Sequence, residues 1–278
     1  MREPVTVLIP TFNEEDNIRA CLESVKWADE LFVVDSFSTD RTLDICRGYT
    51  ERIVQHEYVN SAAQKNWAIP QASHQWVMIV DSDERVSDEL RDSILKALEN
   101  PDEYDGFYVK RETFFLDKLI EHGGWDKEYV LRLFNRERGR YQDKHVHACI
   151  EVEGKTGRLE GVLYHHTYRD LDDYFEKFLR YTKWSAADLK GWKRRASWSN
   201  LAVRPWMRFL KMYLLRGGFL DGKHGLVLSY LAAFSVFAKY ARLWETEIEK
   251  TEDGTEDALP QGSSSSNSAQ RQGIRGKS

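Results

Sequence analysis

The stretch VMIVDSDE, Val77 to Glu84, places four apolar residues directly before a segment of three acids and one serine. Its apolar half predicts a buried strand, and its acidic half predicts carboxylates at the carboxyl end of that strand. Such carboxylates can hold a hard divalent cation, but acids near the start of a helix are also stabilised by the helix dipole. The Asp-x-Asp triplet therefore indicates a site only if the rest of the chain supports it.

Strand and helix patterns alternate over the first hundred residues. Short apolar runs predict strands, and the amphipathic segments between them predict helices. The predicted strands are Val5–Ile9, Glu30–Val34, Arg52–Gln55 and Gln75–Val80. The first predicted helix has its apolar face at Ile18, Leu22 and Val25 and is capped by Thr11 or Asn13. The other predicted helices are Arg41–Gly48, Ala62–Ala72 and Ser87–Glu99. This alternation predicts the α/β class, with right-handed βαβ units and a mostly parallel sheet flanked by helices.

Polar groups follow three of these strands where each strand ends. Pro10 and Thr11 follow the first strand, Asp35 follows the second, and Asp81 with Asp83 follows the fourth. The carboxyl ends of parallel strands meet at one edge of a sheet, and ligands bind there. We therefore expect one site, in which carboxylates hold a cation that neutralises a diphosphate.

The second half of the chain has a different pattern. The segments Gly106–Phe115 and Glu128–Phe134 predict two strands that pair around the loop at Gly123 and Gly124, and Tyr174–Lys190 predicts a helix with an aromatic face. Polar and small residues dominate the last 28 positions, which predicts disorder. We predict three regions: an α/β domain over 1–170, a helical appendage over 171–250 and a disordered tail over 251–278.

The composition limits the classes of protein to consider. A net charge of −5 and the absence of a recognised binding motif argue against nucleic acid as a partner. The three cysteines are far apart and predict reduced thiols. The longest apolar run, Leu226–Ala238, is shorter than the roughly 20 residues of a spanning helix, and no secretory leader is evident. The sequence therefore predicts a cytoplasmic protein, either soluble or peripheral on a membrane.

Residues 189–220 contain eight Lys or Arg, no Asp or Glu, and three tryptophans. Indole rings beside cationic side chains are typical of segments that lie at a membrane interface. A purely structural role for these tryptophans is the alternative. We expect attachment to an anionic membrane surface, on the inner face of the cytoplasmic membrane.

Four segments agree in order and spacing with the family 2 glycosyltransferases, which have the GT-A fold. They are Pro10–Glu14, Val33–Thr42, Gln64–Asn66 and Ile79–Asp83. The resemblance implies a Rossmann-like GT-A domain that binds a nucleotide-sugar donor. The nucleotide-sugar contacts that it implies are Pro10, Thr11, Asn13, Glu14, Asp35, Ser36, Lys65, Asp81 and Ser82.

The resemblance also implies a Mg²⁺ or Mn²⁺ ion bound by Asp83, with Asp81 and His165 as further candidate ligands. His166 is an alternative to His165, and either can instead be a structural histidine. Ser36 stands where the family often has a second acid. Lys65 is compatible with a phosphate contact or with a solvated position on a helix.

The second half resembles the lipopolysaccharide core glucosyltransferases of the WaaE/KdtX type. The segments that carry this resemblance are Gly124–Arg136, Val146-His147, Tyr164–Tyr168, Lys177 and Gly218–Gly222. It implies inverting transfer of a hexose, with glucose from UDP-glucose expected, to a lipid-linked glycan such as the lipopolysaccharide inner core. Within that segment Arg132 and Arg136 suit either a leaving diphosphate or a solvated strand face.

An inverting transfer needs a carboxylate that removes the proton of the acceptor hydroxyl. Asp143 is the first candidate for this base, followed by Glu151 and Asp126. Ala148 stands where the related enzymes typically have a glutamate. Two other functions stay open: transfer of sugar to a polyprenyl phosphate, which needs no such base, and non-catalytic binding of a sugar nucleotide at a membrane.

Overall fold

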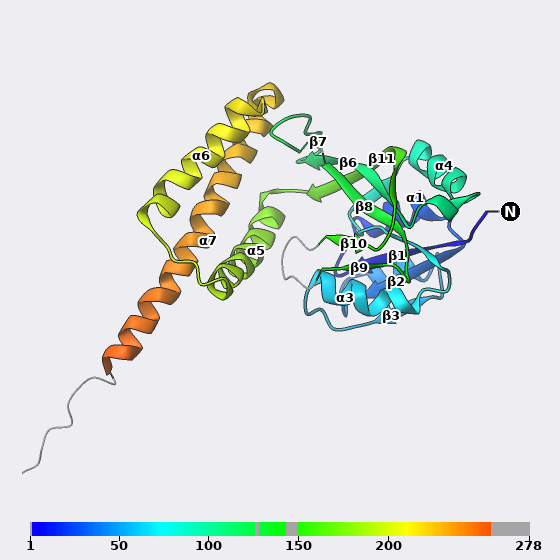
Figure 1. Ribbon diagram of the computed structural model, residues 1–278, viewed down its shortest axis with the longest axis horizontal. Helices are drawn as coiled ribbons and strands as arrows, with labels where there is room; N and C mark the ends of the chain where they lie inside the picture. Colours follow the sequence, from blue (N-terminus) through cyan, green and yellow to red (C-terminus); the bar gives the residue numbers. More distant parts are fainter. Residues whose placement is uncertain (1, 126–127, 143–148, 257–278) are drawn as a thin grey trace, which may run out of the picture.

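The computed structural model describes residues 2–125, 128–142 and 149–256, and it contains one large mixed sheet and a group of helices beyond one edge of it (Figure 1). The sheet has nine strands in the order β3-β2-β1-β4-β8-β6-β11-β5, with β7 paired to β6. The strands of this sheet are β1 Val5–Thr11, β2 Glu30–Asp35, β3 Ile53–Gln55, β4 Trp76–Ile79, β5 Glu84–Val86, β6 Gly106–Phe115, β7 Lys118–Leu119, β8 Glu128–Asn135 and β11 Thr156–Tyr168. A separate antiparallel pair consists of β9 Gly139–Tyr141 and β10 Ile150–Val152.

The pairing of the strands brings several carboxyl ends to one edge. β1 runs parallel to β2 and β4, and β2 runs parallel to β3. β8 is antiparallel to both β4 and β6, so β4 and β6 point in the same direction, and β11 runs parallel to β6. Strands β1, β2, β4, β6 and β11 therefore all end at the edge that faces the C-terminal helices (Figure 1). This arrangement confirms the predicted α/β class.

Each face of the sheet has its own apolar core. On one face, strand residues such as Val7 and Met78 pack with Leu22 of α1 and Leu90 of α4. On the other face, Leu8 and its neighbours pack with α3 and with the β9–β10 pair. The helices of this part are α1 Ile18–Val25, α2 Thr42–Cys46, α3 Ser61–Ala68 and α4 Asp88–Ala97, with short 3-10 turns η1 Ile69–Gln71 and η2 Pro101–Glu103.

The start of the first helix differs from the prediction. We expected Thr11 or Asn13 to cap it, but Thr11 is the last residue of β1 and α1 begins only at Ile18. Asn13 has a φ of +52°, a left-handed conformation that is incompatible with the backbone of a helix cap. The predicted cap was wrong because residues 12–17 form the loop between strand and helix.

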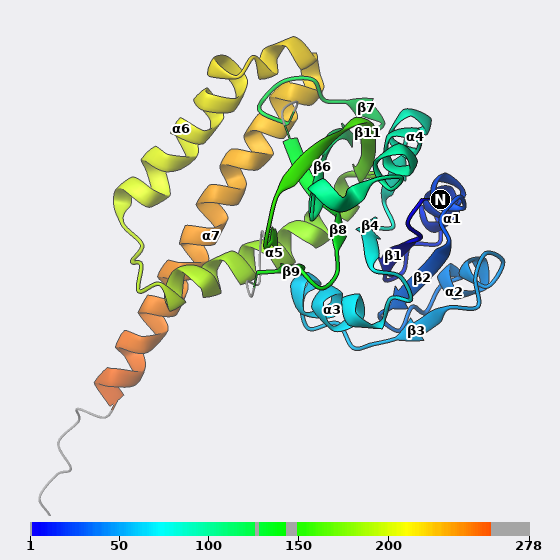
Figure 2. The same cartoon turned by 45° about the vertical axis from the view of Figure 1, so that its right-hand side comes forward.

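The helical region begins where β11 ends. It consists of α5 Leu171–Gly191, η3 Ser199–Val203, α6 Arg204–Leu210, η4 Lys211–Leu215, η5 Gly218–Asp221 and α7 Gly222–Glu256. Helix α7 lies between α6 and the sheet domain in both views (Figures 1 and 2). It packs on α5 through a stacked pair of rings, Phe178 and Phe234, whose centroids are 5.2 Å apart.

One segment of this region exceeds the length that the apolar run predicted. Gly218–Ile248, 31 residues, is long and apolar enough to cross a membrane by length and composition alone, and it is the one such segment in the described part of the chain. α7 continues to Glu256, and residues 257–278, most of the predicted tail, lie outside the described residues.

A buried carboxylate joins the helical region to the sheet domain. Asp221 is 2% exposed and accepts hydrogen bonds from the backbone N–H groups of Glu121 and His122, at 3.3 and 3.0 Å. The His122 ring lies 3.3 Å from the same carboxylate, and Lys118 Nζ donates to the Asp221 carbonyl at 2.9 Å. These contacts fix the loop after β7 against η5.

Candidate active site

The loops after β1 and β2 interlock at the edge where the strands end. Ser36 N–H donates to the Thr11 carbonyl at 2.9 Å, and Asn13 N–H donates to Ser38 Oγ at 2.9 Å. Thr39 N–H in turn donates to Asn13 Oδ1 at 2.8 Å. Asn13 thus keeps its left-handed backbone because its side chain and its N–H both bind the neighbouring loop.

Asp35 lies beneath these loops and is completely buried. Its carboxylate accepts from Ser38 N–H at 3.0 Å, Ser38 Oγ at 2.5 Å and Gln55 Nε2 at 2.9 Å. Its predicted nucleoside contact stays a prediction. The rings of Phe12 and Phe37 on the same two loops are 49% and 55% exposed, which leaves aromatic faces available to a nucleobase.

Thr11, Ser36 and Lys65 are buried at this edge together with Ser82. Gln64 Nε2 donates to Ser36 Oγ at 2.5 Å, so the serine that replaces an acid in the family pattern is bound within the protein. The Thr11 hydroxyl is buried and has no hydrogen-bond partner. An orphaned buried hydroxyl is costly, so Thr11 is a group that a ligand can satisfy.

Asp81 is held between two cations. Its Oδ1 lies 2.7 Å from Lys65 Nζ, and its Oδ2 lies 2.9 Å from Arg132 Nη2. Burial raises the pKa of Asp81, but the charges of Lys65 and Arg132 outweigh burial and hold that pKa far below its ordinary value. Burial lowers the pKa of Lys65, and the charge of Asp81 outweighs it and raises that pKa. All three groups are therefore charged at neutral pH.

The charges continue inward from Asp81 as an alternating chain. Arg132 also binds Glu84, at 2.6 Å, and Glu84 is completely buried. Arg111 lies 3.5 Å from Glu84 and 2.7 Å from the more exposed Glu128. We name this chain, Lys65–Asp81–Arg132–Glu84–Arg111–Glu128, the strand-end ion chain. Lys65 is a buried member of it, so the interpretation of Lys65 as a solvated lysine is wrong.

Asp83 forms the second half of the acidic pair and contacts His165. Its Oδ2 lies 3.4 Å from His165 Nε2, and both side chains are 16% exposed. Burial raises the pKa of Asp83, but the charge of His165 outweighs it, so that pKa is lowered. His165 Nδ1 is buried and has no hydrogen-bond partner. Successive residues of a strand point to opposite faces of the sheet, so the next histidine, His166, points away from Asp83. Its ring stacks on Phe114, with centroids 4.6 Å apart.

The Asp83–His165 pair fits a divalent cation that also binds a ligand. In the described part of the chain, no three His, Cys, Asp or Glu side chains are grouped to hold a metal ion by themselves. Mg²⁺ in phosphate-transfer sites is often held by one or two carboxylates and completed by substrate phosphates and water. Asp81, predicted as a further metal ligand, has both oxygens engaged by Lys65 and Arg132, so a metal-binding role for it stays a prediction.

Helix α5 reaches this site with its first turns. Lys177 Nζ donates to the Thr167 carbonyl at 2.9 Å and lies 3.2 Å from Asp173. Its charge lowers the pKa of both Asp83 and Glu14. Burial, followed by the charge of Asp83, still leaves the pKa of Glu14 raised. Glu14, which we predicted to contact the nucleotide sugar, thus lies close to Asp83, the predicted metal ligand.

The sequence matches the Glycosyl transferase family 2 over residues 6–153, more than half of the chain. The chain belongs to this family. Its mixed, mostly parallel sheet with flanking helices is of the GT-A type that the family resemblance implied.

This family 2 chain is similar to other glycosyltransferases over nearly its whole length. It is 28% identical over 263 residues to the lipopolysaccharide core biosynthesis glycosyltransferase LpsC of Rhizobium meliloti (strain 1021), covering 92% of this chain and 97% of that protein. It is also 28% identical over 263 residues to the uncharacterized glycosyltransferase RT0209 of Rickettsia typhi (strain ATCC VR-144 / Wilmington), covering 88% of each.

Two solved structures show weaker likeness to this glycosyltransferase. S. aureus TarS 1–349 aligns with 90% of this chain and 92% of that chain, at 16% identity and a TM-score of 0.43. The glucosyl-3-phosphoglycerate synthase of Mycobacterium tuberculosis, in complex with Mn²⁺ and UDP-glucose, covers 40% of this chain and 44% of that chain, at 21% identity and a TM-score of 0.35.

Of the three candidate bases of this glycosyltransferase, Glu151 alone lies among the described residues. Asp143 and Asp126 lie outside the described residues. Glu151 is exposed on β10 and accepts a hydrogen bond from Gln142 Nε2 at 2.5 Å. The choice among the three acids stays a prediction.

The two arginines that we considered for the diphosphate have different places. Arg132 is a buried member of the strand-end ion chain. Arg136 donates to the Ala72 carbonyl, and the adjacent Asn135 pairs with Trp76 at the amino end of β4. Arg136 lies at the opposite edge of the sheet, so its proposed contact with a diphosphate was wrong.

Proposed function

We propose that this family 2 glycosyltransferase transfers a hexose, with glucose from UDP-glucose as the expected donor, to a lipid-linked glycan such as the lipopolysaccharide inner core. The observation that carries the proposal is the Asp83–His165 pair, set beside an Asp81 carboxylate that lies between Lys65 and Arg132 at the carboxyl ends of parallel strands. Similarity to LpsC over nearly the whole chain supports a glycan acceptor of this kind.

In this proposal Asp83 and His165 hold a Mg²⁺ or Mn²⁺ ion. Such an ion, held there, would supply positive charge to the diphosphate leaving group. Lys65 and Arg132 keep the Asp81 carboxylate in one position, where it can accept a hydrogen bond from the donor. The loops that bury Thr11 and Asp35 bind the nucleoside.

The transfer inverts the anomeric carbon. The acceptor oxygen attacks from the face opposite the diphosphate, the new C–O bond forms, and the bond to the leaving phosphate oxygen breaks. A carboxylate takes the proton of the acceptor hydroxyl. Asp143, Glu151 and Asp126 are the candidates for that carboxylate.

The first test is a screen of UDP-, GDP- and TDP-hexoses with a membrane extract as acceptor, followed by determination of the linkage formed. We expect transfer from UDP-glucose that requires Mg²⁺ or Mn²⁺ and gives a β linkage. Transfer that persists in EDTA, or transfer only from a GDP- or TDP-sugar, would contradict the proposal.

The Asp83→Asn variant tests the metal-binding role directly. It keeps the size of the side chain but removes the charge, so we expect loss of metal-dependent transfer and of Mn²⁺-stimulated donor binding in calorimetry. Asp92→Asn, at an exposed position of α4, is the matched control and should behave as the wild type. Unchanged activity of Asp83→Asn would refute the role.

Variants of the candidate bases separate the proposal from its alternatives. Asp143→Asn, Glu151→Gln and Asp126→Asn proteins that all retain full activity would favour a phosphate acceptor, such as a polyprenyl phosphate. Donor binding without turnover on any lipid acceptor would favour a non-catalytic binding protein.

A further inference from the structure

The helical segment Ser199–Leu215, formed by η3, α6 and η4, exposes an apolar stripe. Its members recur every three or four residues and are 42–64% exposed: Val203, Trp206, Met207, Leu210 and Leu214. A surface helix of a globular protein normally turns such a stripe toward the core. The stripe of this segment therefore leaves roughly half of its apolar surface exposed in the described part of the chain.

The other side of the same helix is the side that packs. The Phe209 ring lies 4.5 Å from the Tyr230 ring of α7, and Met212 is 1% exposed. Helix α7 lies between α6 and the sheet in both views (Figures 1 and 2), and the side of the segment with Phe209 and Met212 packs inward, so the exposed stripe lies on another side of the segment. It can thus meet a large surface without closing the active site.

Cationic side chains accompany the stripe. Arg204 and Arg208 of α6 and Lys211 of η4 follow one another at helical spacing, and Lys239 of α7 is close enough to Arg204 and Arg208 to feel their charges. Arg204 Cζ and Lys239 Nζ lie 5.7 and 5.5 Å from the centre of the Tyr240 ring, so both cations gather at one aromatic side chain. In the described part of the chain, no carboxylate forms an ion pair with any of these four residues.

The cations also act on one another. Burial, followed by the charges of Arg204 and Arg208, lowers the pKa of Lys239. Burial and the charge of Arg216 lower the pKa of Arg208. Mutual repulsion of this kind is relieved when an anion binds among the cations.

We propose that this face, the stripe together with Arg204, Arg208, Lys211 and Lys239, docks on the surface of an anionic lipid bilayer. The apolar stripe and the indole of Trp206 would enter the headgroup region, as in interfacial amphipathic helices. The cations beside it would bind lipid phosphates. The inner face of the cytoplasmic membrane carries the negative surface potential that such cations require.

Neither a second copy of this chain nor a spanning helix fits these observations as well. An isologous dimer through this face would bring the same cations of two copies together, and like charges repel. Insertion of α7 across a bilayer would break its packing on α5, where Arg242 Nε donates to Thr182 Oγ1 at 3.1 Å and Phe178 stacks on Phe234.

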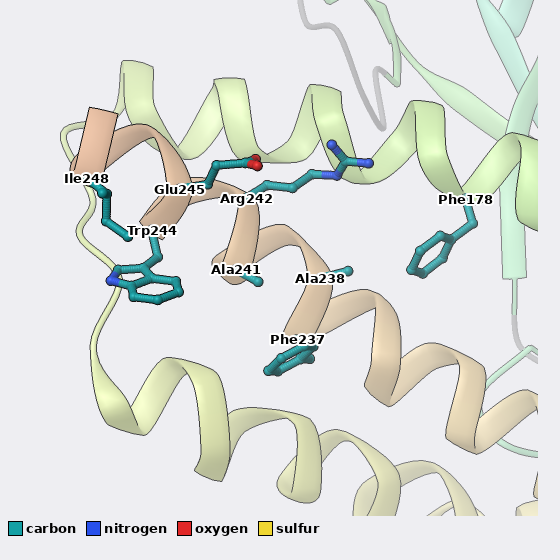
Figure 3. A pocket seen from close by; sticks show the side chains of 8 residues that line it. All are labelled: Phe178, Phe237, Ala238, Ala241, Arg242, Trp244, Glu245 and Ile248. Carbon is teal, nitrogen blue, oxygen red and sulfur yellow. The ribbon is translucent and has the colours of Figure 1, made fainter. Parts of the chain in front are cut away.

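A second apolar hollow, between α5 and α7, lacks the charge pattern of the docking face (Figure 3). Figure 3 shows Phe178, Phe237 and Trp244 among the side chains that line it. Its two charged residues, Arg242 and Glu245, have opposite charges and give no preference for an anionic surface. We therefore assign the docking to α6.

The test is co-sedimentation of the full chain with vesicles of phosphatidylcholine alone or with 30% phosphatidylglycerol. We expect binding to the anionic vesicles that weakens with salt, and little binding to the neutral ones. The variant Arg204→Gln/Arg208→Gln/Lys239→Gln should bind the anionic vesicles about 100-fold more weakly. Each Lys or Arg near an anionic surface contributes roughly five-fold to the affinity, and the variant removes all three. Trp206→Ala/Met207→Ala should also weaken binding.

The matched control is Lys26→Gln/Arg47→Gln/Lys96→Gln, which removes three cations from the sheet domain and should bind as the wild type. If the first triple variant does not fold, Lys211→Glu at an exposed position should still weaken binding, by about 30-fold. Equal binding to neutral vesicles, wild-type binding by the triple variant, or concentration-dependent dimerisation that removes vesicle binding would overturn the proposal. Sedimentation needs neither donor nor turnover, so its failure would leave the proposed transferase activity untouched.

Discussion

Arg132 is the residue on which the geometry of Asp81 depends. It is buried between Asp81 and Glu84, and Glu84 also accepts a hydrogen bond from the Asp81 N–H at 3.0 Å. A buried charge that loses one of its partners is strongly destabilising, because its desolvation is no longer compensated. Glu84 therefore serves both the fold and the position of the site carboxylate.

The Glu84→Gln variant should test this dependence. Removal of the buried charge leaves Arg132 with one anion fewer, and we expect the free energy of unfolding in urea to fall by up to about 3–5 kcal/mol. Glu128→Gln alters the outer end of the same chain, where the side chain is 40% exposed, and should cost at most about 1 kcal/mol. If both variants lose the same free energy of unfolding, the burial of a carboxylate does not determine how much its ion pair contributes to stability.

Glu14 makes stability depend on pH. Its pKa is raised in the folded state by burial and by Asp83, so the folded protein binds this proton more tightly than the unfolded chain does. Stability must then fall as the pH rises above the ordinary range of a glutamate, near 4.3. We expect Glu14→Gln, which can still accept from Asn17, to melt above the wild type at pH 7 and to match it below pH 4. A melting temperature at or below the wild type's at pH 7 would contradict this cause.

The acids of the site were predictable residue by residue, whereas their partners were not. Asp35, Asp81 and Asp83 follow apolar runs, and the rule that parallel strands end at one edge is sufficient to bring them together. Arg132 lies 48 residues from Glu84 in the chain, and only the antiparallel placement of β8 brings them into contact. The burial of Glu84 could not be predicted from the sequence, since a fully buried acid is rare unless it is paired.

Strand β11 is the element that delivers His165 to the site. Its pairing with β6 shifts between Arg158 and Val162, and Gly161 within that shift has a φ of +82°. A Cβ at Gly161 would lie 2.2 Å from the backbone nitrogen of Leu90. The glycine therefore allows helix α4 to pack directly on the irregular part of the strand.

Gly161→Ala should destabilise the protein by more than about 2 kcal/mol, through the left-handed backbone and the close approach of α4. A chemical denaturation series measures this loss. Gly191→Ala is a useful control, because Gly191 ends α5 with nothing within 4 Å of its Cβ position. We expect that control to be neutral or to stabilise the helix by up to about 1 kcal/mol.

Elements with a strong period were predictable, and short or irregular ones were not. The strand Gly106–Phe115 and the buried face of α1 agree with the structure. β5 has three residues and begins with Glu84, and so short a segment has no alternating pattern. We therefore predicted no strand between the strand that ends at Val80 and the helix that starts at Ser87. β11 contains Gly157 and Gly161 and charged residues on its exposed side, which interrupts any alternation.

At the scale of the whole molecule, Asp221 connects two parts that are distant in the sequence. It is buried in the joint between η5 and the loop that precedes the segment with Asp126. Asp221→Asn replaces one acceptor oxygen by an NH₂ group that faces a backbone N–H. We expect a loss of about 1–3 kcal/mol and faster hydrogen exchange in residues 118–125.

Asp172→Asn, at an exposed position in the first turn of α5, is the control for this experiment. It should leave exchange in residues 118–125 unchanged. If Asp221→Asn also leaves that segment unchanged, the joint does not depend on this carboxylate.

Under the proposed function, the strand-end ion chain would influence the order in which the donor and its cation bind. Three cations alternate with three carboxylates in it, so its net charge is zero before any ligand binds. A free sugar diphosphate gains no unpaired positive charge from Lys65 or Arg132. Where His165 is neutral, as a metal ligand must be, the charge of Asp83 is uncompensated and would repel the diphosphate. The donor should therefore enter together with its cation or after it, and in steady-state kinetics the apparent KM for the donor should fall as the concentration of free Mn²⁺ rises.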